Sequence, residues 1–474
     1  MVFSSTVFLF AFFPVTMALY FIPVSLKNKK RELNKKNLIL LLTSLVFYAW
    51  GEPVYVVLML ISIFFNYVVG IDIHNSKAAG RKKTAKLLFV AAVVFNLFLL
   101  GFFKYSGFIV DNINSIFGTS LQNRQLPLPV GISFYTFQIL SYVIDVYKGK
   151  TEAQKRFVPF AAYITMFPQL IAGPIVQYSD IEKQLCDRTV SRELFFDGIM
   201  HFVKGLGKKV LFANVIGKVY TDILAADISE QSMATAWIGI ICYTLQIYFD
   251  FSGYSDMAVG LGKMLGFEFV RNFNFPYSAT SVTDFWRRWH ISLSSWFRDY
   301  VYIPLGGNRK GTARTIVNIL IVWALTGMWH GASWNFIAWG GFYGILLILE
   351  KYVFRSLLEK IPVAVKHILT MLIVMTGWVF FSNENISEAF GYLSAMLGIN
   401  GNLLWDNTSS YLVQSYGFAI FVMSVSSFGF FDNIFTSFRN RHPALKAGFY
   451  FAVYVLCVAF LLSETYNPFL YFRF

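Results

Sequence analysis

The sequence is poor in charged residues and in cysteine. Only 14% of its 474 residues are charged and 56% are hydrophobic, whereas a soluble domain has about 25% charged residues. Polar side chains are too few to cover a protein of this size, so we expect much of its surface to face lipid. The three cysteines, Cys186, Cys242 and Cys457, lack the spacing of metal ligands and cannot all form disulfides. The composition therefore excludes a soluble domain held together by disulfides or zinc.

Several motifs of nucleotide-binding and hydrolytic enzymes are also missing. Segments 205–209 and 260–263 combine glycine with lysine, but neither fits the GxxxxGK[ST] pattern of a P-loop. The sequence has no GxSxG elbow and no His/Cys/carboxylate set with metal spacing, so we predict no metal and no bound cofactor. The net charge of +14 comes from short basic clusters between apolar runs, at 27–36, 81–86 and 309–314. That distribution indicates a membrane protein and gives nucleic acid no basic domain to bind.

Apolar runs separated by charged segments predict an all-α integral membrane protein. The first run, Val7–Leu26, is followed and not preceded by its basic cluster. This order is the reverse of a secretory signal peptide, so we expect a retained first helix with the N-terminus outside. The run Phe157–Val176 contains three prolines and a glycine, a density of helix breakers that favours a re-entrant segment over a spanning helix.

About twelve spans result in all. Several are shorter than the ~20 residues of a straight span, so we expect tilt, membrane thinning or helices that do not fully cross. We find no internal repeat, linker or soluble domain, and we expect residues 1–474 to form one membrane domain. The predicted spans are Val7–Leu26, Leu38–Trp50, Pro53–Val69, Leu87–Val110, Pro129–Val146, Val210–Ala226, Ala234–Phe251, Ile316–Trp329, Trp334–Leu349, Val363–Phe381, Leu412–Phe431 and Phe449–Leu462.

The segment Asp284–Tyr300 mixes aromatic, basic and histidine side chains. A helical projection predicts one interfacial amphipathic helix, with a capping box formed by Ser281 and Asp284 at its start. His290 lies at the edge of the apolar face, where it can point into the protein. The apolar face consists of Phe285, Trp289, Leu293, Trp296 and Tyr300, and the opposite face carries Arg287, Arg288 and Arg298.

A second unusual segment, Leu325–Trp334, joins two apolar runs. Gly327 and Gly331 are four residues apart and allow close helix contact, and His330 lies between them. An ionisable group at membrane depth costs about 3 kcal/mol unless it is buried in protein and has a partner. His330 is therefore a candidate functional residue, and the alternative is a structural histidine bonded to a carbonyl at a helix end.

A third segment, Gln246–Asp256, places Asp250 and Asp256 at the end of a span. Two such acids form either a proton-coupled transport site or an anchor for the backbone and for the arginines of the next helix. We favour the anchor, because no matching basic residue lies inside the neighbouring predicted spans.

These motifs together resemble the membrane-bound O-acyltransferase (MBOAT) family, in particular the bacterial branch that contains the alginate O-acetylation membrane protein. The resemblance covers most of residues 1–350, and residues 351–474 match more loosely apart from the ending Tyr466–Phe474. The matching segments are Met1–Ser5, Phe47–Trp50, Leu128–Tyr135, Ser141–Tyr147, Phe167–Pro174, Tyr248–Asp256, Asp284–His290, Leu305–Arg309 and Gly327–Ala332.

The resemblance implies an MBOAT-like multi-span fold, with about 11–12 spans and with re-entrant and interfacial helices around a central tunnel. It implies transfer of an acyl group, most simply acetyl, from a cytoplasmic donor such as acetyl-CoA or another acyl thioester to an acceptor on the other side. The family's membrane histidine corresponds to His330, the expected general base, and its second polar position corresponds to His290, which orients the donor or gives a second proton path. The expected substrate-binding residues are Trp286, Arg287, Arg288, Trp329, Asp250, Ser252, Tyr254 and Asp256.

The resemblance also implies a location and partners. We expect a multi-pass protein of the bacterial plasma membrane, surrounded by lipid. Because the loops are short, the acceptor polysaccharide is acylated either directly or through an extracytoplasmic acetyltransferase-like partner protein, and no nucleic acid is involved.

Three alternatives stay open. A sister branch of the family transfers D-alanine toward teichoic acids. A proton-coupled transporter or flippase would use Asp250 and Asp256, although we see none of the pseudo-symmetric halves that it predicts. A non-catalytic membrane scaffold is the third alternative, and the glycine-flanked His330 argues against it.

Overall fold

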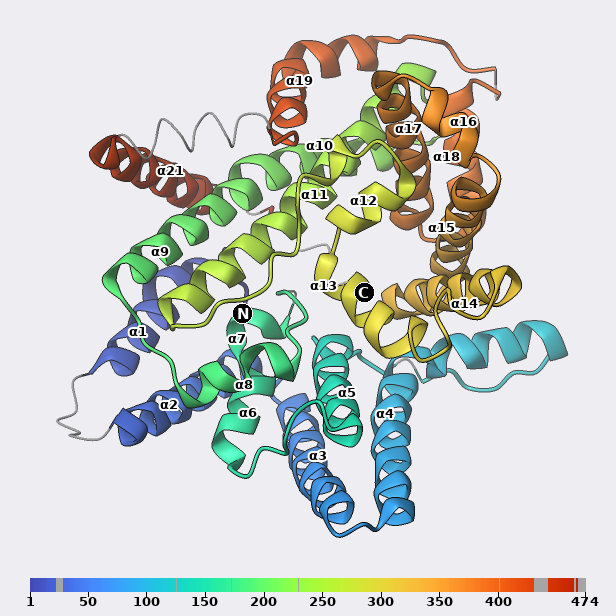
Figure 1. Ribbon diagram of the computed structural model, residues 1–474. Coiled ribbons are helices and arrows are strands. Elements are labelled where there is room, and N and C mark those ends of the chain that lie inside the picture. Colours follow the sequence, from blue (N-terminus) through green and yellow to red (C-terminus); the bar gives the residue numbers. More distant parts are fainter. Residues whose placement is uncertain are drawn as a thin grey trace. The chain divides into compact units, whose positions relative to one another are not determined.

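The computed structural model consists of helices joined by turns and loops (Figure 1). Of the predicted ending Tyr466–Phe474, the structure describes only the first two residues. Lys27, Ala172 and the last two residues of the predicted span Leu412–Phe431 also lie outside the described residues. The structure describes residues 1–22, 29–124, 126–171, 173–228, 230–399, 401–429, 442–463 and 466–467.

The chain divides into two compact units. The first consists of Met1–Phe202 and Ser255–Val270, and the second of Val203–Tyr254 and Arg271–Phe474. Two helices, α9 (Arg192–Gly207) and α11 (Met233–Met264), continue from one unit into the other. That residues 1–474 form a single domain stays a prediction.

The first unit packs its helices through aromatic rings and through buried amides. The rings of Phe8, Phe47 and Phe167 lie within 6.3 Å of one another. Between α3 and α4, Asn66 and Asn96 exchange two side-chain hydrogen bonds of 2.7 and 3.1 Å, which satisfies both amides inside an apolar pair of helices. The elements are η1 (Phe8–Phe12), α1 (Phe13–Phe21), α2 (Lys29–Ala49), α3 (Tyr55–Ala78), α4 (Lys82–Phe117), α5 (Ile132–Lys148), α6 (Phe157–Thr165), α7 (Phe167–Leu170) and α8 (Tyr178–Cys186).

The proline-rich run Phe157–Val176 does not form a continuous helix. It makes the nine-residue helix α6 and the four-residue helix α7, and an extended stretch follows. Nine residues of α-helix rise about 14 Å, half the thickness of a hydrocarbon core. The predicted break of the helix in this run is confirmed, and that the run re-enters the membrane stays a prediction.

The second unit holds the segments with the unusual motifs. Its elements are η2 (Lys208–Ala213), α10 (Asn214–Leu224), η3 (Pro276–Ser278), α12 (Val282–Arg288), α13 (Ile291–Phe297), η4 (Arg298–Tyr302), α14 (Thr312–His330), α15 (Trp334–Tyr352), α16 (Arg355–Lys360), α17 (Val363–Ser382), α18 (Ile386–Leu397), α19 (Asn407–Ser426) and α21 (Pro443–Ser463).

Five helices of the described chain are long and apolar enough to cross a membrane, namely α3, α4, α14, α17 and α21. Each of them coincides with a predicted span. The first predicted span, Val7–Leu26, appears as the shorter apolar helix Phe8–Phe21. The remaining predicted spans coincide with helices that are shorter or more polar, and that these cross the membrane stays a prediction.

Candidate active site

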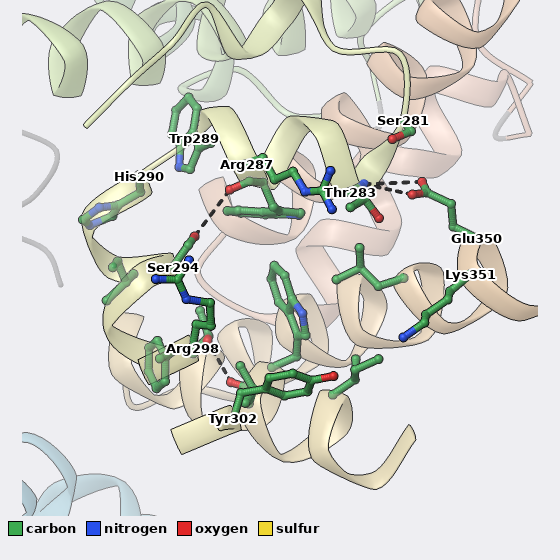
Figure 2. Close-up of a pocket in the computed structure, with 18 of the residues that line it drawn as sticks. Ser281, Thr283, Arg287, Trp289, His290, Ser294, Arg298, Tyr302, Glu350 and Lys351 are labelled. Atoms are coloured by element: carbon green, nitrogen blue, oxygen red, sulfur yellow. Dashed lines mark hydrogen bonds between the residues drawn. The ribbon is translucent and has the colours of Figure 1, made fainter. Parts of the chain in front are cut away.

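The second unit contains a cavity of about 770 Å³ between α12, α13, α14, α15 and their neighbours (Figure 2). Both His290 and His330 line it, and so do Trp286 and Arg287. The structure therefore brings together four of the residues that the sequence predicted for the site. Trp329, Arg288, Asp250, Ser252, Tyr254 and Asp256 do not line this cavity.

The predicted continuous helix over Asp284–Tyr300 is wrong, because the chain breaks at His290. Helix α12 ends at Arg288 and α13 starts at Ile291. Between them His290 adopts a left-handed conformation, with φ 45° and ψ 54°, which is costly for a residue with a side chain and often marks a functional site. The predicted apolar face survives the break, since Phe285, Trp289, Leu293, Trp296 and Tyr300 are all buried.

Asn272, in the loop between α11 and η3, holds this break in place. Its backbone carbonyl accepts a 2.9 Å bond from the Ile291 N–H. Its side-chain Oδ1 accepts from the Ser292 N–H at 3.2 Å and from the Ser292 hydroxyl at 2.9 Å, and it lies 3.1 Å from His290 Nδ1. Asn272 thus supplies the cap for α13, which His290 itself does not provide.

His290 is 1% exposed and packs against Phe251, Phe273 and Trp329. Burial lowers the pKa of His290 to about 3, because a charged imidazolium loses its hydration inside the protein. The ring is therefore neutral at pH 7 and has one nitrogen with a lone pair.

His330 is the last residue of α14 and is 4% exposed. Its ring lies edge-on to those of Trp329, Trp339 and Phe381, with centroids 5.0 to 5.2 Å apart. Trp329 contacts both histidines, because its ring is also 6.0 Å from that of His290. The two histidines thus share an aromatic neighbour as well as a cavity.

Glycines bring α14 and α15 close together around His330. A Cβ atom on Gly327 would collide with the backbone carbonyl of Phe336, and one on Gly331 would collide with the Phe336 ring. A Cβ atom on Gly340 would likewise collide with the carbonyl of Trp323. The predicted close contact at Gly327 and Gly331 is confirmed.

Glu350 of α15 fixes the start of α12. Its carboxylate accepts bonds from the N–H groups of Val282 at 2.7 Å and of Thr283 at 3.1 Å, the latter visible in Figure 2. The Ser281 hydroxyl accepts from the Asp284 N–H at 3.0 Å, as expected for a cap, but the Asp284 carboxylate accepts from Thr280 N–H. Negative charge at a helix N-terminus stabilises it, so Glu350 ties the helix before His290 to the helix after His330.

The arginines of the motif divide into two roles. Arg287 and Arg298 are exposed and line the cavity. Arg288 does not line the cavity and pairs with Asp284 at 2.8 Å, four residues earlier on the same helix. The hydrogen bond from Arg298 to Asp299 raises the Arg298 pKa, so this guanidinium carries a permanent positive charge at the cavity.

The acidic segment of α11 is partnered differently from our expectation. Asp250 forms an ion pair with Lys209 of η2 at 2.7 Å, and both side chains are 3% exposed. Lys209 immediately precedes the predicted span Val210–Ala226, so it is not among the basic residues inside the predicted spans. Lys208 donates to Ser252 at 3.4 Å, Tyr254 is buried, and Asp256 falls in the part of α11 that belongs to the first unit.

Asn272 and Glu350 are the site residues that sequence reasoning did not find. Neither belongs to a motif: Asn272 lies 18 residues before His290 in an aromatic loop, and Glu350 lies near the end of an apolar run. Their role follows only from long-range contacts. In the described part of the chain, no three His, Cys, Asp or Glu side chains gather as a metal site would require.

Comparison with known proteins gives matches over nearly the whole chain. Residues 155–382, which include both histidine motifs, match the membrane-bound O-acyltransferase family. The probable alginate O-acetylase AlgI of Azotobacter vinelandii is 42% identical over 419 residues, covering 87% of this chain and 81% of that protein. The peptidoglycan O-acetyltransferase of Helicobacter pylori is 35% identical, covering 85% of this chain and 80% of its own length.

The sister branch is more distant. The teichoic acid D-alanyltransferase of Bacillus subtilis is 27% identical, covering 47% of this chain and 59% of its own length. The resemblance inferred from the sequence motifs is confirmed by these matches.

Proposed function

Because this chain belongs to the membrane-bound O-acyltransferase family and is an O-acyltransferase, we propose that it O-acetylates an extracytoplasmic polysaccharide. The acetyl group comes from a cytoplasmic thioester, acetyl-CoA or another acyl thioester, which is a substrate and not a bound cofactor. His330 is the general base. The relatives named for O-acetylation of alginate and of peptidoglycan cover most of the chain, which favours acetyl transfer over D-alanyl transfer.

One observation carries the proposal: two buried histidines line one cavity whose edge also carries arginine. A hydroxyl is a weak nucleophile at neutral pH, so its proton must leave as it attacks the thioester carbonyl. A positioned imidazole contributes about 10²–10⁴-fold to such a step. His330 takes the proton, a carbon–oxygen bond forms, the carbon–sulfur bond breaks, and the proton finally reaches the thiolate sulfur, with His290 as the second proton path.

The lining of the cavity suits a thioester with an anionic carrier. Trp286 packs on Trp323 and Tyr343 with ring centroids 4.8 Å away, which gives one wall a rigid aromatic surface. Arg287 and Arg298 add positive charge at exposed positions. We propose that the acyl chain lies against the aromatic wall while the arginines attract the charged part of the donor.

The ion pair of Asp250 in the second unit argues against the transporter alternative. It requires Asp250 to carry a mobile proton, whereas Asp250 is engaged in a buried ion pair with Lys209. Such a pair is an anchor between η2 and α11, and a lone buried charge would cost several kcal/mol. We therefore propose a structural role for Asp250, with Ser252 and Tyr254 in the same packed interface.

The proposal includes a location and partners. The protein crosses the bacterial plasma membrane about twelve times with its N-terminus outside, the run Phe157–Val176 is re-entrant, and the bilayer around the protein is thinned. The acceptor polysaccharide receives the acetyl group directly or through an extracytoplasmic acetyltransferase-like protein.

Replacement of His330 by Gln tests the mechanism. The variant should insert and accumulate like the wild type but release no acetate from cell-surface polysaccharide on mild base treatment, because Gln cannot accept the hydroxyl proton. His74→Gln, on α3 and not among the residues that line the cavity, is the matched control and should keep full acetylation. Retained acetylation in His330→Gln removes His330 from the mechanism, and release of D-alanine instead of acetate from the wild type selects the sister activity.

A further inference from the structure

Asn272 makes an unusual set of contacts for a loop asparagine. It is 1% exposed, and its Oδ1 lies within 3.2 Å of three groups, the Ser292 N–H, the Ser292 hydroxyl and His290 Nδ1. These contacts join a loop residue to the point where the chain breaks between α12 and α13. They also determine where the hydrogen of the His290 ring must be.

The backbone N–H of Ser292 fixes the orientation of the Asn272 amide. A backbone N–H can only donate, so the amide atom 3.2 Å from it is the oxygen and not the NH₂ group. An amide oxygen can only accept, so the His290 Nδ1 that lies 3.1 Å from it must carry the hydrogen. A neutral imidazole has one N–H, and Nε2 therefore keeps the lone pair.

We propose that Asn272 is a positioning residue for acyl transfer, which selects the His290 tautomer with hydrogen on Nδ1 and makes Nε2 the proton-accepting atom. This inference rests on the proposed function. A proton that leaves the acceptor hydroxyl, directly or through His330, forms an N–H bond at His290 Nε2. The Nδ1–H group of His290 meanwhile keeps its hydrogen bond to Asn272. The same proton then passes to the thiolate sulfur released when the carbon–sulfur bond breaks, and the ring returns to its neutral tautomer.

A merely structural role is the competing explanation, because Asn272 also caps α13 through Ser292. Asn272→Leu removes both functions and does not separate them. Asn272→Asp does, because an aspartate oxygen accepts the same three bonds, and among the described residues the NH₂ group that it replaces has no hydrogen-bond partner. Three donors also keep the new carboxylate ionised.

The new charge would act directly on the His290 ring, because the Asn272 oxygen that it replaces lies 3.1 Å from Nδ1. The charged or titratable groups on the elements around His290 include Asp250 on α11, Arg271 in the loop, Asp284, Arg287 and Arg288 on α12, Arg298 and Asp299 after α13, and His330 on α14. Of these, Asp250 pairs with Lys209, Arg288 with Asp284 and Arg298 with Asp299, and Arg271 donates to the carbonyl of Phe273. A carboxylate at 272 therefore raises the pKa of His290, by about 1–3 pH units at this distance.

The test measures acetyl transfer from labelled acetyl-CoA by purified full-length protein in lipid nanodiscs, as a function of pH. We expect the acid limb of the kcat/KM profile of Asn272→Asp to move to higher pH by about 1–3 units, because His290 then stays protonated and unable to accept a proton. Asn272→Leu should lose about a hundredfold in kcat or more. An Asn272→Asp profile that overlays the wild-type profile overturns the inference.

A second readout does not depend on activity. In nitrogen-15 NMR of protein labelled at its six histidines, the His290 signals are identified by their absence from His290→Asn. We expect a protonated Nδ1 and an unprotonated Nε2 in the wild type, and the reverse tautomer overturns the inference. Failure of the wild type to transfer acetyl in nanodiscs counts against the proposed function instead, and the NMR result still decides the tautomer.

Discussion

Removal of one charge from the Lys209–Asp250 pair should destabilise the protein, whereas removal of both should not. The two side chains are 2.7 Å apart and each is 3% exposed, so Asp250→Leu alone leaves a lysine charge inside the helix packing. Such an uncompensated charge costs about 3–5 kcal/mol. For a chain of this length we expect the melting temperature to fall by about 3–10 °C, using roughly 1–2 °C per kcal/mol.

The double variant Lys209→Met/Asp250→Leu replaces the pair by apolar side chains of similar size and should recover most of the lost stability. Melting of the purified protein in detergent measures stability, and acetate released from cell-surface polysaccharide measures activity. Glu32→Gln is the matched control, because it breaks a surface pair with Lys36 of the same 2.7 Å length, worth less than about 1 kcal/mol. A folded, stable double variant without acetyl transfer would refute an anchoring role and give Asp250 a chemical one.

Two further predictions concern the segments that carry the histidines. Gly327→Ala should lower acetylation about tenfold or more, because its Cβ collides with the Phe336 carbonyl and displaces the end of α14 by a fraction of an ångström. The control Gly341→Ala on α15, where a Cβ meets nothing within 4 Å, should leave acetylation unchanged. His290→Asn and His290→Val should both lack acetyl transfer, but the valine variant should melt lower by the equivalent of about 1–2 kcal/mol, because asparagine tolerates the left-handed backbone and a β-branched residue does not. Equal melting of these two variants would show that the φ of 45° is not imposed by the fold.

Sequence patterns located both histidine motifs but not the geometry between them. Projection on a regular helix correctly assigned the buried face from Phe285 to Tyr300, because side-chain direction repeats with the helical period within the helices on each side of the break. The break itself escaped the projection, because it depends on Asn272 bonding to residues 18 and more positions later. The periodicity of hydrophobic residues within one segment gives no information on such a long-range contact.

The acidic segment Gln246–Asp256 is a second case in which the sequence pattern did not predict a long-range contact. A count of basic residues inside the predicted spans found no counterpart for Asp250, and yet Lys209 lies 2.7 Å away. The lysine precedes the apolar run by one residue, and the π-helical turn η2 that contains it packs against α11. Span boundaries taken from hydropathy are uncertain by a few residues, which is enough to hide an ion pair.

Composition and local pattern by themselves determined that this chain is a helical membrane protein, that the run Phe157–Val176 is broken, and that Gly327 lets two helices meet at His330. Each of these depends on properties of neighbouring residues: apolar length, proline geometry and the missing Cβ atom of glycine. Only the tertiary structure decided that His290 and His330 share one cavity, that Glu350 anchors α12, and that the Asn272 amide oxygen lies 3.1 Å from His290 Nδ1. The physical reason is that hydrogen bonds and ring contacts act over a few ångströms between residues far apart in the chain, and folding alone brings them within that range.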